Sequence, residues 1–165
     1  MSFSLTKLAM IKKRHEFLAV KSGASKVGSS SSSSFGSSWG TAGFLLQACL
    51  REDQKNLQED KRSEARFGVT VTNNTIRKMI SAPQKGKNPK KVNEKRGPVS
   101  VLRNKMRRRL KEALRQIAPE LARPGVDYVI IGRQACLSID YADLLKDLEK
   151  SFKKVHRRII SSGTD

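Results

Sequence analysis

The stretch VLRNKMRRRLKEALRQ, residues 101–116, combines helical spacing of apolar side chains with seven cations. At 100° per residue, one stripe collects six apolar side chains from this stretch and the residue just after it: Leu102, Met106, Leu110, Ala113, Leu114 and Ile117. Most cations fall on the opposite half, where Glu112 is the acidic exception. Because like charges one turn apart destabilise a helix, this clustering favours a face that binds an anion over one that is merely solvated.

The whole chain has the same positive excess, with 34 Lys and Arg against 15 Asp and Glu and a net charge of +19. From Arg77 to Arg115 there are fifteen cations and two acids. Such a balance indicates an anionic partner, either nucleic acid or a membrane surface. A membrane surface is the weaker alternative, because the apolar stripe of the helix lacks Trp and Phe and has the size expected of a core face.

Nothing in the sequence predicts membrane insertion or secretion. It contains no run of 18 apolar residues, and its start lacks the apolar segment and small-residue cleavage site of a signal peptide. Cys49 and Cys136 both lie in apolar runs, and we expect them to be reduced and buried in strands. These features predict a cytoplasmic protein without a membrane partner.

Segments on either side of the basic helix predict a small sheet. Three have the composition of strands: GFLLQACL (residues 43–50), RFGVTVT (66–72) and DYVIIGR (127–133). Residues 8–21 and 138–159 keep helical spacing, the second with Ser138 as a plausible N-cap. Pro119, followed by Pro124 and Gly125, is expected to end the basic helix. The order predicts an α+β fold, with a small mixed sheet and three helices, in one domain spanning residues 1–165.

Two segments fit neither helix nor strand by composition. The stretch GSSSSSSFGSSWG, residues 28–40, has too little apolar surface to form a core, and Trp39 is its largest candidate anchor. Residues 73–98 are basic, interrupted by Pro and Gly, and show little apolar periodicity. We predict that both are flexible insertions, the second of them adding positive charge.

Taken in order, these segments resemble the bacterial ribonuclease P protein subunit. Arg103, Asn104 and Lys105 match its arginine-asparagine-arginine motif, with lysine in place of the third motif residue. The resemblance extends to IKKRHEFLAV (11–20), WGTAGFLLQA (39–48), RFGVTVT (66–72), PGVDYVIIGR (124–133) and SIDYADLLKDLEKSFKKV (138–155). Without the two insertions it covers about two thirds of the chain.

The resemblance implies a ribosomal-protein-S5-domain-2-like α+β fold with a left-handed β-α-β crossover around the motif helix. It also implies a function, as the protein subunit of a ribozyme that removes the 5′ leader from precursor tRNA. The expected partners are the catalytic RNA subunit and precursor tRNA. Mg²⁺ is expected to act through the RNA subunit, which would perform the hydrolysis, and no catalytic or metal-binding residue is assigned to the protein.

Two groups of residues are carried over from the family. The motif helix would contact the catalytic RNA through Arg103, Asn104, Lys105, Arg107, Arg108 and Lys111. A cleft between the first helix and the sheet would hold the single-stranded leader through Phe17, Lys21, Gln47, Thr70 and Thr72. Lys21 and Gln47 stand at positions that are often aromatic in the family, so this cleft would depend more on charge and hydrogen bonds. Phe17 would stack on a base, unless it is an ordinary core residue.

No residue pattern in the sequence predicts that the protein itself is catalytic. His15 and His156 lack the spacing of a general base or of a metal set, and the acids show no converging cluster. Two other functions stay open on the sequence alone. One is a basic ribosomal or RNA-assembly protein without a role in catalysis, and the other is a helix that binds DNA or a membrane surface.

Overall fold

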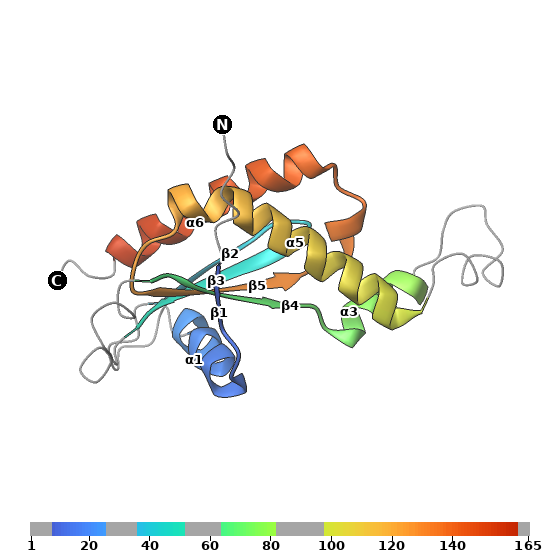
Figure 1. The fold of residues 1–165 in the computed structure, drawn as a ribbon, viewed down its shortest axis with the longest axis horizontal. Coiled ribbons are helices and arrows are strands. Elements are labelled where there is room, and N and C mark those ends of the chain that lie inside the picture. The colour runs from blue at the N-terminus through green and yellow to red at the C-terminus, as the bar shows by residue number, and fades with distance from the viewer. Residues whose placement is uncertain (1–7, 26–35, 52–63, 82–97, 162–165) are drawn as a thin grey trace.

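The computed structural model describes residues 8–25, 36–51, 64–81 and 98–161, which form a five-stranded mixed sheet with helices on both faces (Figure 1). The strands are β1 (Ala9–Met10), β2 (Gly36–Gly40), β3 (Phe44–Leu50), β4 (Arg66–Thr70) and β5 (Val126–Gly132). The helices are α1 (Arg14–Ser25), α3 (Asn73–Ser81), α5 (Val99–Leu121), α6 (Tyr141–Ser161) and the short 3₁₀ helix η1 (Gln134–Leu137). The predicted α+β class is confirmed.

The strand order is β1-β4-β5-β3-β2. The pairs β1–β4 and β4–β5 are parallel, whereas β5–β3 and β3–β2 are antiparallel, so the sheet is mixed as predicted. Parallel neighbours need a crossover connection, and here the chain passes from β4 to β5 through α3 and α5. The left hand of this crossover stays a prediction of the family resemblance.

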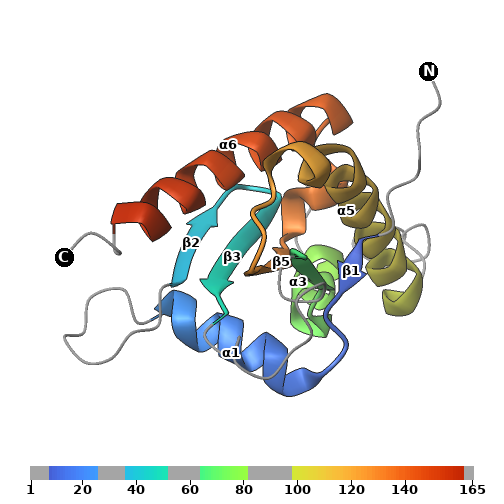
Figure 2. The ribbon, with the colours of Figure 1, turned by 60° about the vertical axis from the view of Figure 1, so that its left-hand side comes forward.

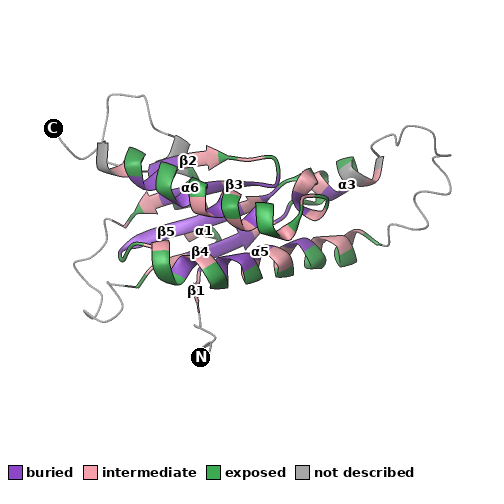
Figure 3. Cartoon of the chain, turned by 90° about the horizontal axis from the view of Figure 1, so that it is seen from above, coloured by how far each residue is buried: buried purple, intermediate pink, exposed green. Residues whose placement is uncertain are grey.

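The larger part of the core lies between the sheet and the pair α5 and α6. Phe67 of β4 stacks on Tyr128 of β5 with ring centroids 5.4 Å apart, and Tyr128 contacts Phe152 of α6 at 5.0 Å. From α5, the buried residues Met106, Leu110, Ala113, Leu114 and Ala118 face this core. The apolar stripe predicted for the basic helix is therefore a core face, and Figure 3 shows the alternation of buried and exposed residues along α5.

A smaller cluster lies on the other face of the sheet, beneath α1. It contains Ile11, Val20 and Val129, with Phe17 and Ile131 packed against it. Figure 2 shows α1 and α6 on opposite sides of β2 and β3. Because α1 covers its face with so few apolar contacts, part of the sheet beside it stays open.

The first segment corrects the predicted helix at 8–21, because α1 begins only at Arg14. Ala9 and Met10 instead pair with β4, and the Ile11 amide donates to the Phe67 carbonyl at 2.8 Å. At the helix start, the Glu16 carboxylate accepts a hydrogen bond from the Lys13 amide at 3.2 Å, as in half of a capping box. Pairing with a distant strand therefore overrides the local helical periodicity.

The predicted flexible insertion at 28–40 is wrong for residues 36–40, which form β2. This strand pairs with β3 from Gly36 opposite Cys49 to Gly40 opposite Leu45. Trp39 lies beneath two cations of α6, with Lys154 at 5.4 Å and Arg158 at 4.9 Å from its ring centroid. Ladder bonds and this ring contact compensate for the poor strand propensity of Gly and Ser, and residues 28–35 lie outside the described residues.

The predicted insertion at 73–98 is likewise wrong for residues 73–81, which form α3 and make four α-helices among the described residues, not three. The Thr72 hydroxyl accepts a hydrogen bond from the Thr75 amide at 3.2 Å and so caps this helix. Ile76 is fully buried in the main core. The cap and the buried side chain explain why so short a basic segment is helical, and residues 82–97 lie outside the described residues.

Three smaller predictions also need correction. Pro119 does not end α5, which continues to Leu121 because the lost N–H is a single donor near the helix end. Ser138 does not cap α6; the Asp140 carboxylate accepts from the Ala142 amide at 3.1 Å instead. Cys136 is buried in η1, not in a strand, and Cys49 in β3 is only half-buried, although both cysteines are free as expected.

Candidate nucleic-acid interface

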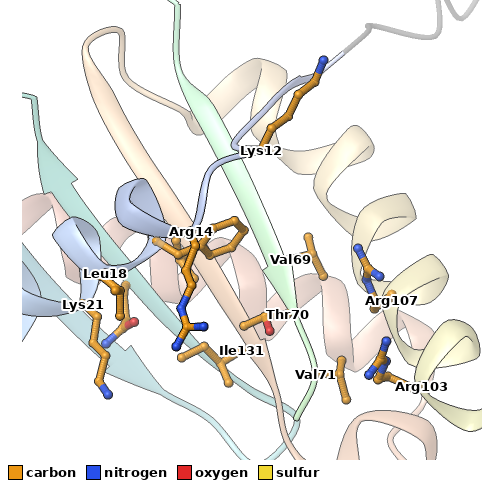
Figure 4. A pocket seen from close by; sticks show the side chains of 13 residues that line it. Lys12, Arg14, Leu18, Lys21, Val69, Thr70, Val71, Arg103, Arg107 and Ile131 are labelled. Carbon is orange, nitrogen blue, oxygen red and sulfur yellow. The ribbon is translucent and has the colours of Figure 1, made fainter. Parts of the chain in front are cut away.

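A cleft of about 500 Å³ lies between α1, the open part of the sheet and the first half of α5 (Figure 4). Its lining consists of Lys12, Arg14, Phe17, Leu18, Lys21, Gln47, Val69, Thr70, Val71, Arg103, Arg107, Val129 and Ile131. Five of these residues are cations and none is an acid. In Figure 4, Arg103 and Arg107 project from α5 on one side, while Arg14 and Lys21 come from the α1 side. The cleft thus combines an apolar floor with cations on both walls.

Phe17 packs directly onto the sheet at Gly68. A Cβ atom at Gly68 would lie 2.5 Å from Cε1 of Phe17, far inside van der Waals contact. Glycine at this position is therefore what lets the ring approach β4 so closely. The ring stays partly exposed and borders the cleft, so Phe17 is a packing residue that also offers an aromatic surface to a ligand.

The predicted leader-binding residues divide into four that share the cleft and one that does not. Phe17, Lys21, Gln47 and Thr70 all line it, coming from α1, β3 and β4. Thr72 is not among the lining residues, because it lies beyond the end of β4 and its hydroxyl caps α3. The family resemblance predicted both threonines in the cleft, but it could not show that β4 ends at Thr70, before Thr72.

The predicted RNA-binding residues of α5 also divide, according to the direction they face. Arg103 and Arg107 line the cleft, and Arg103 donates to the Asn73 side chain at 3.0 Å. Outside the cleft lie the exposed residues Asn104, Lys105 and Arg108 and the half-buried Lys111. The motif helix therefore presents one set of cations to the cleft and another to the outside.

Arg109 has a third orientation, although it belongs to the same run of three arginines. Its guanidinium donates to the Ile139 carbonyl and lies 5.7 Å from the ring centroid of Tyr141. Arg109 thus joins α5 to the start of α6. A run of identical residues on a helix serves three separate environments because successive side chains are 100° apart.

A chain of charged groups holds α1 against the end of the sheet. Arg66 on β4 donates to Glu16 at 2.7 Å and to both carboxylate oxygens of Asp127, at 2.9 and 2.5 Å, and Arg51 lies 3.3 Å from Asp127. Although its partial burial acts the other way, the pKa of Glu16 is lowered by the Lys13 amide and by Arg66. The hydrogen bonds to Asp127 raise the pKa of Arg66. This network sets the position of the α1 wall.

His156 and Cys136 are titratable groups buried in the core and not in the cleft. His156 contacts the Tyr128 hydroxyl at 2.7 Å, and burial followed by the nearby Arg123 lowers its pKa to about 4. Burial raises the pKa of Cys136 to about 11, so this thiol is not a reactive nucleophile. Among the described residues, no group of three His, Cys, Asp or Glu side chains could hold a metal ion.

Sequence reasoning missed several residues of the cleft. Lys12 and Arg14 belong to the KKRH stretch at the start of α1, where the cluster of cations was the available signal. Val129 and Ile131 were expected in a buried strand, and nothing in their sequence shows that α1 leaves this face of β5 partly open. The sequence also does not show that the motif helix lines the cleft, because this contact between distant segments forms only when the chain folds.

Comparison with known proteins identifies the family. A family profile described as Ribonuclease P matches residues 87–156. The Ribonuclease P protein component of Paramagnetospirillum magneticum is 34% identical over 149 residues, which cover 90% of this chain and 84% of that protein. This chain belongs to the ribonuclease P protein family. The corresponding protein of Gluconacetobacter diazotrophicus is also 34% identical to this family member, over 87% of the chain and 88% of that protein.

Solved structures of ribonuclease P proteins share the fold. The Staphylococcus aureus protein covers 89% of this chain with a TM-score of 0.54 and 18% identity, and 94% of its own length is matched. The Thermotoga maritima protein covers 88% of this chain with a TM-score of 0.53 and 18% identity, and 96% of its own length is matched. The family resemblance inferred from the sequence is therefore confirmed in both sequence and fold.

The alternative of a basic ribosomal or RNA-assembly protein is not favoured. Each relative named above is a ribonuclease P protein component, not a ribosomal or assembly protein. The helices that the structure describes include none long and apolar enough to cross a bilayer. The function is argued below from membership of the ribonuclease P protein family.

Proposed function

We propose that the chain acts in tRNA 5′ maturation by binding the catalytic RNA with the outer face of α5 and the 5′ leader of precursor tRNA in the cleft. The observation that carries this proposal is the composition of the cleft. It joins one aromatic ring, an apolar floor and five cations, with no acid among its lining residues. Single-stranded RNA needs such a surface, because its bases stack on aromatic and apolar groups while its phosphates pair with cations.

The arrangement of the cleft supports a single strand of RNA as its occupant. Val129 and Ile131 of β5 form an apolar floor against which Phe17 packs, and the lining cations come from the α1 side and from α5. Bases would point toward the floor and phosphates toward the walls. Since Arg103 and Arg107 belong to both the motif helix and the cleft, they would lie where the leader and the catalytic RNA come closest.

We assign the hydrolysis to the RNA subunit with Mg²⁺ and give the protein a binding and orienting role. The donor set supports this assignment, because a hard cation such as Mg²⁺ prefers oxygen ligands, whereas the charged groups that line the cleft are all cationic. The protein would neutralise phosphates and hold the leader while the RNA subunit acts in the cytoplasm. Lys105 can neutralise a phosphate but cannot form the bidentate contact of the arginine it replaces.

Reconstitution with the cognate catalytic RNA tests this function. The protein should stimulate cleavage of precursor tRNA at low Mg²⁺, and the holoenzyme should bind leader-bearing precursor more tightly than mature tRNA. Phe17→Ala should weaken binding of the leader-bearing form by about 1–3 kcal/mol, the range for loss of one stacked base, and leave binding of mature tRNA unchanged.

Val101→Ala is a matched control, because Val101 is an apolar side chain of α5 that is 55% exposed and lies outside the cleft lining. It should change neither affinity. Equal losses for both RNAs with Phe17→Ala would indicate a folding defect. An absence of stimulation by the wild-type protein at every salt concentration would contradict the assignment.

A further inference from the structure

The second half of α6 carries a cluster of cations that the proposed function does not use. Residues 150–158 include no acidic side chain. The cations of this segment are all exposed: Lys150, Lys153, Lys154, Arg157 and Arg158. On a helical wheel they fall within an arc of about 140°, on a different face from the buried residues Phe152 and Val155. We call these five exposed cations the α6 patch.

The same face of α6 has a different charge pattern in the first half of the helix. There Asp143 and Asp147 lie on either side of Lys146 in the sequence, and Lys146 pairs with Asp143 at 3.4 Å. Mixed charges of this kind are typical of a face that only contacts water, because opposite charges one turn apart stabilise a helix. The change from mixed to wholly positive charge along one face separates the α6 patch from an ordinary solvated surface.

The stability of α6 does not explain the patch. Cations are favourable near the C-terminus of a helix, but this effect is confined to the last turn, and α6 ends at Ser161. Lys150 and Lys154 lie about two turns or more before that end and are about one turn from each other. Like charges at this spacing destabilise a helix. An anionic partner that neutralises the charges would offset this repulsion.

Trp39 of β2 holds two cations of the α6 patch in place. Lys154 lies 5.4 Å and Arg158 lies 4.9 Å from the centroid of its ring, and Arg158 also donates to the Ser38 carbonyl at 2.7 Å. An aromatic ring and a carbonyl orient a cation without neutralising its charge. Because long cationic side chains lose conformational entropy when they are fixed, cations that are already oriented bind an anion at a smaller entropic cost.

The chemistry of the α6 patch favours the phosphates of RNA over a membrane surface. A helix that binds a membrane surface inserts large apolar side chains beside its cations. Among the described residues, the exposed large apolar side chains are Leu18, Leu50 and Val101, and none of them belongs to α6. Phosphates of an RNA helix need only exposed cations, and such a surface is what the second half of α6 offers.

The position of the α6 patch indicates which RNA it contacts. The helices α5 and α6 lie on the sheet face opposite α1 (Figures 1 and 2), so the patch is on the side away from the leader cleft. From Tyr141, which Arg109 of α5 contacts, the patch extends from about 14 to about 25 Å along α6. A partner bound to the outer face of α5 could continue along this layer, and the catalytic RNA is the partner proposed for that face.

We propose that the α6 patch is a second binding surface for the catalytic RNA, whose backbone phosphates it contacts through exposed cations that Trp39 helps to orient. The inference rests on the proposed function, which supplies the catalytic RNA as the partner. It adds an anchoring surface that is separate from both the motif helix and the cleft.

The experiment measures binding of the full chain to the cognate catalytic RNA at a series of salt concentrations. Lys150→Gln should lower the slope of the logarithm of affinity against the logarithm of salt by about one unit, because each phosphate contact releases about one counterion. The double variant Lys150→Gln with Lys154→Gln should lower it by about two units. Affinity should fall about two- to fivefold for each exposed charge removed. Lys150→Arg keeps the charge and should keep both the slope and the affinity.

Lys146→Gln is the matched control, because Lys146 is an exposed lysine on the same face of the same helix, outside the patch and paired with Asp143. It removes the same charge as Lys150→Gln and should change neither the slope nor the affinity. An equal loss of slope in the two variants would mean that the slope follows only the net charge of the chain, which would overturn the inference.

A second measurement separates RNA binding from a structural role. Since Lys150→Gln relieves repulsion between like charges, the thermal midpoint of the free variant should equal or exceed that of the wild type. A fall in the midpoint would indicate that Lys150 stabilises the fold, and it would overturn the inference.

Two further RNAs identify the partner of the patch. Binding of leader-bearing precursor to the assembled holoenzyme should be the same for Lys150→Gln and the wild type, and a loss in this step alone would assign the patch to the precursor. The loss of affinity for an unrelated double-stranded RNA should be smaller than for the catalytic RNA. Equal losses for both would mean non-specific attraction, and either of these contrary results would overturn the inference.

Failure of the inference and failure of the proposed function give different results. If the wild-type protein stimulates cleavage of precursor tRNA while both patch variants keep the wild-type slope, the inference fails and the proposed function stands. If the wild-type protein does not stimulate cleavage at any salt concentration, the proposed function fails first.

Discussion

At the scale of single residues, the Tyr128–His156 contact shows how burial fixes a protonation state. The Arg123 amide donates to the Tyr128 oxygen at 3.0 Å, and burial raises the pKa of Tyr128 to about 12, so the hydroxyl keeps its proton. The hydroxyl can donate that proton to the His156 Nε2 atom 2.7 Å away in the tautomer of the neutral ring that leaves Nε2 unprotonated. Protonation of His156 would break this arrangement.

The pKa of His156 predicts a pH-dependent stability. Because it is about 4 in the folded protein and 6.5 ordinarily, the unfolded chain binds more protons between these values. The free energy of unfolding should therefore fall as the pH drops from 6.5 toward 4, by up to about 3 kcal/mol. Denaturant unfolding at a series of pH values measures this slope.

His156→Gln should lack this part of the pH dependence. His15→Gln is the matched control, because His15 is exposed on α1, and it should keep the wild-type slope. A wild-type slope in His156→Gln would assign the acid sensitivity to other groups.

At the scale of elements, the position of α1 depends on one charged network. Glu16 caps the start of the helix and also accepts a hydrogen bond from Arg66, which is fixed in turn by Asp127 at the start of β5. Phe17 follows Glu16 directly in the chain. A shift of α1 at this point would therefore move the ring away from Gly68 and change the width of the cleft.

Glu16→Gln should loosen α1 without unfolding the protein. Since the Glu16–Arg66 pair is partly exposed, with side-chain exposures of 20% and 26%, the loss of stability should stay below about 1 kcal/mol. Affinity for leader-bearing precursor should fall about two- to fivefold, because one cleft wall is less well positioned, while affinity for mature tRNA is unchanged. Binding titrations of the holoenzyme with both RNAs measure the difference.

Glu112→Gln provides the comparison for α1. It neutralises an exposed acid that pairs with Arg115 at 3.0 Å on α5, away from the cleft. If Glu16→Gln and Glu112→Gln have the same effect on leader binding, the network does not position α1.

At the scale of the whole molecule, the positive charge is divided between surfaces with different predicted partners. Arg107 lines the cleft and Arg108 is exposed outside it, although the two are adjacent in sequence. A net charge of +19 makes binding to any RNA salt-dependent, so affinity alone does not separate the two surfaces. The two surfaces can be distinguished by the salt dependence of two binding steps: protein binding to the catalytic RNA, and holoenzyme binding to leader-bearing precursor.

Arg108→Ala should reduce the salt slope for binding of the protein to the catalytic RNA by about one unit, the value for one lost phosphate contact. Arg107→Ala should reduce by a similar amount the slope for binding of leader-bearing precursor to the holoenzyme. Titrations between low and moderate salt measure both slopes.

Lys146→Ala removes a charge from α6 that is paired with Asp143 at 3.4 Å, and it should change neither slope. Unchanged slopes in Arg107→Ala and Arg108→Ala would mean that both arginines are only solvated.

Local sequence pattern was sufficient to predict the helices and strands whose apolar residues face a single core. The helix α5, the strands β3 and β5 and most of α6 follow from periodicity, and four of the five predicted cleft residues share one cleft. The segments β1, β2 and α3 were missed, because each is held mainly by partners that are distant in sequence. Gly36–Gly40 is a strand because β3 pairs with it, and Asn73–Ser81 is a helix in part because Ile76 enters the core.

The sequence by itself predicted the α+β class, indicated an anionic partner and, through the ordered resemblance of its segments, pointed to the family. These properties depend on charge, on apolar spacing and on residue identity, all of which are local. The tertiary structure alone decided that Arg103 and Arg107 share a cleft with Phe17, that Thr72 caps a helix and that the Gln47 oxygen has no partner among the described residues. These properties depend on which distant segments come into contact, and a contact between distant segments is a property of the packed chain.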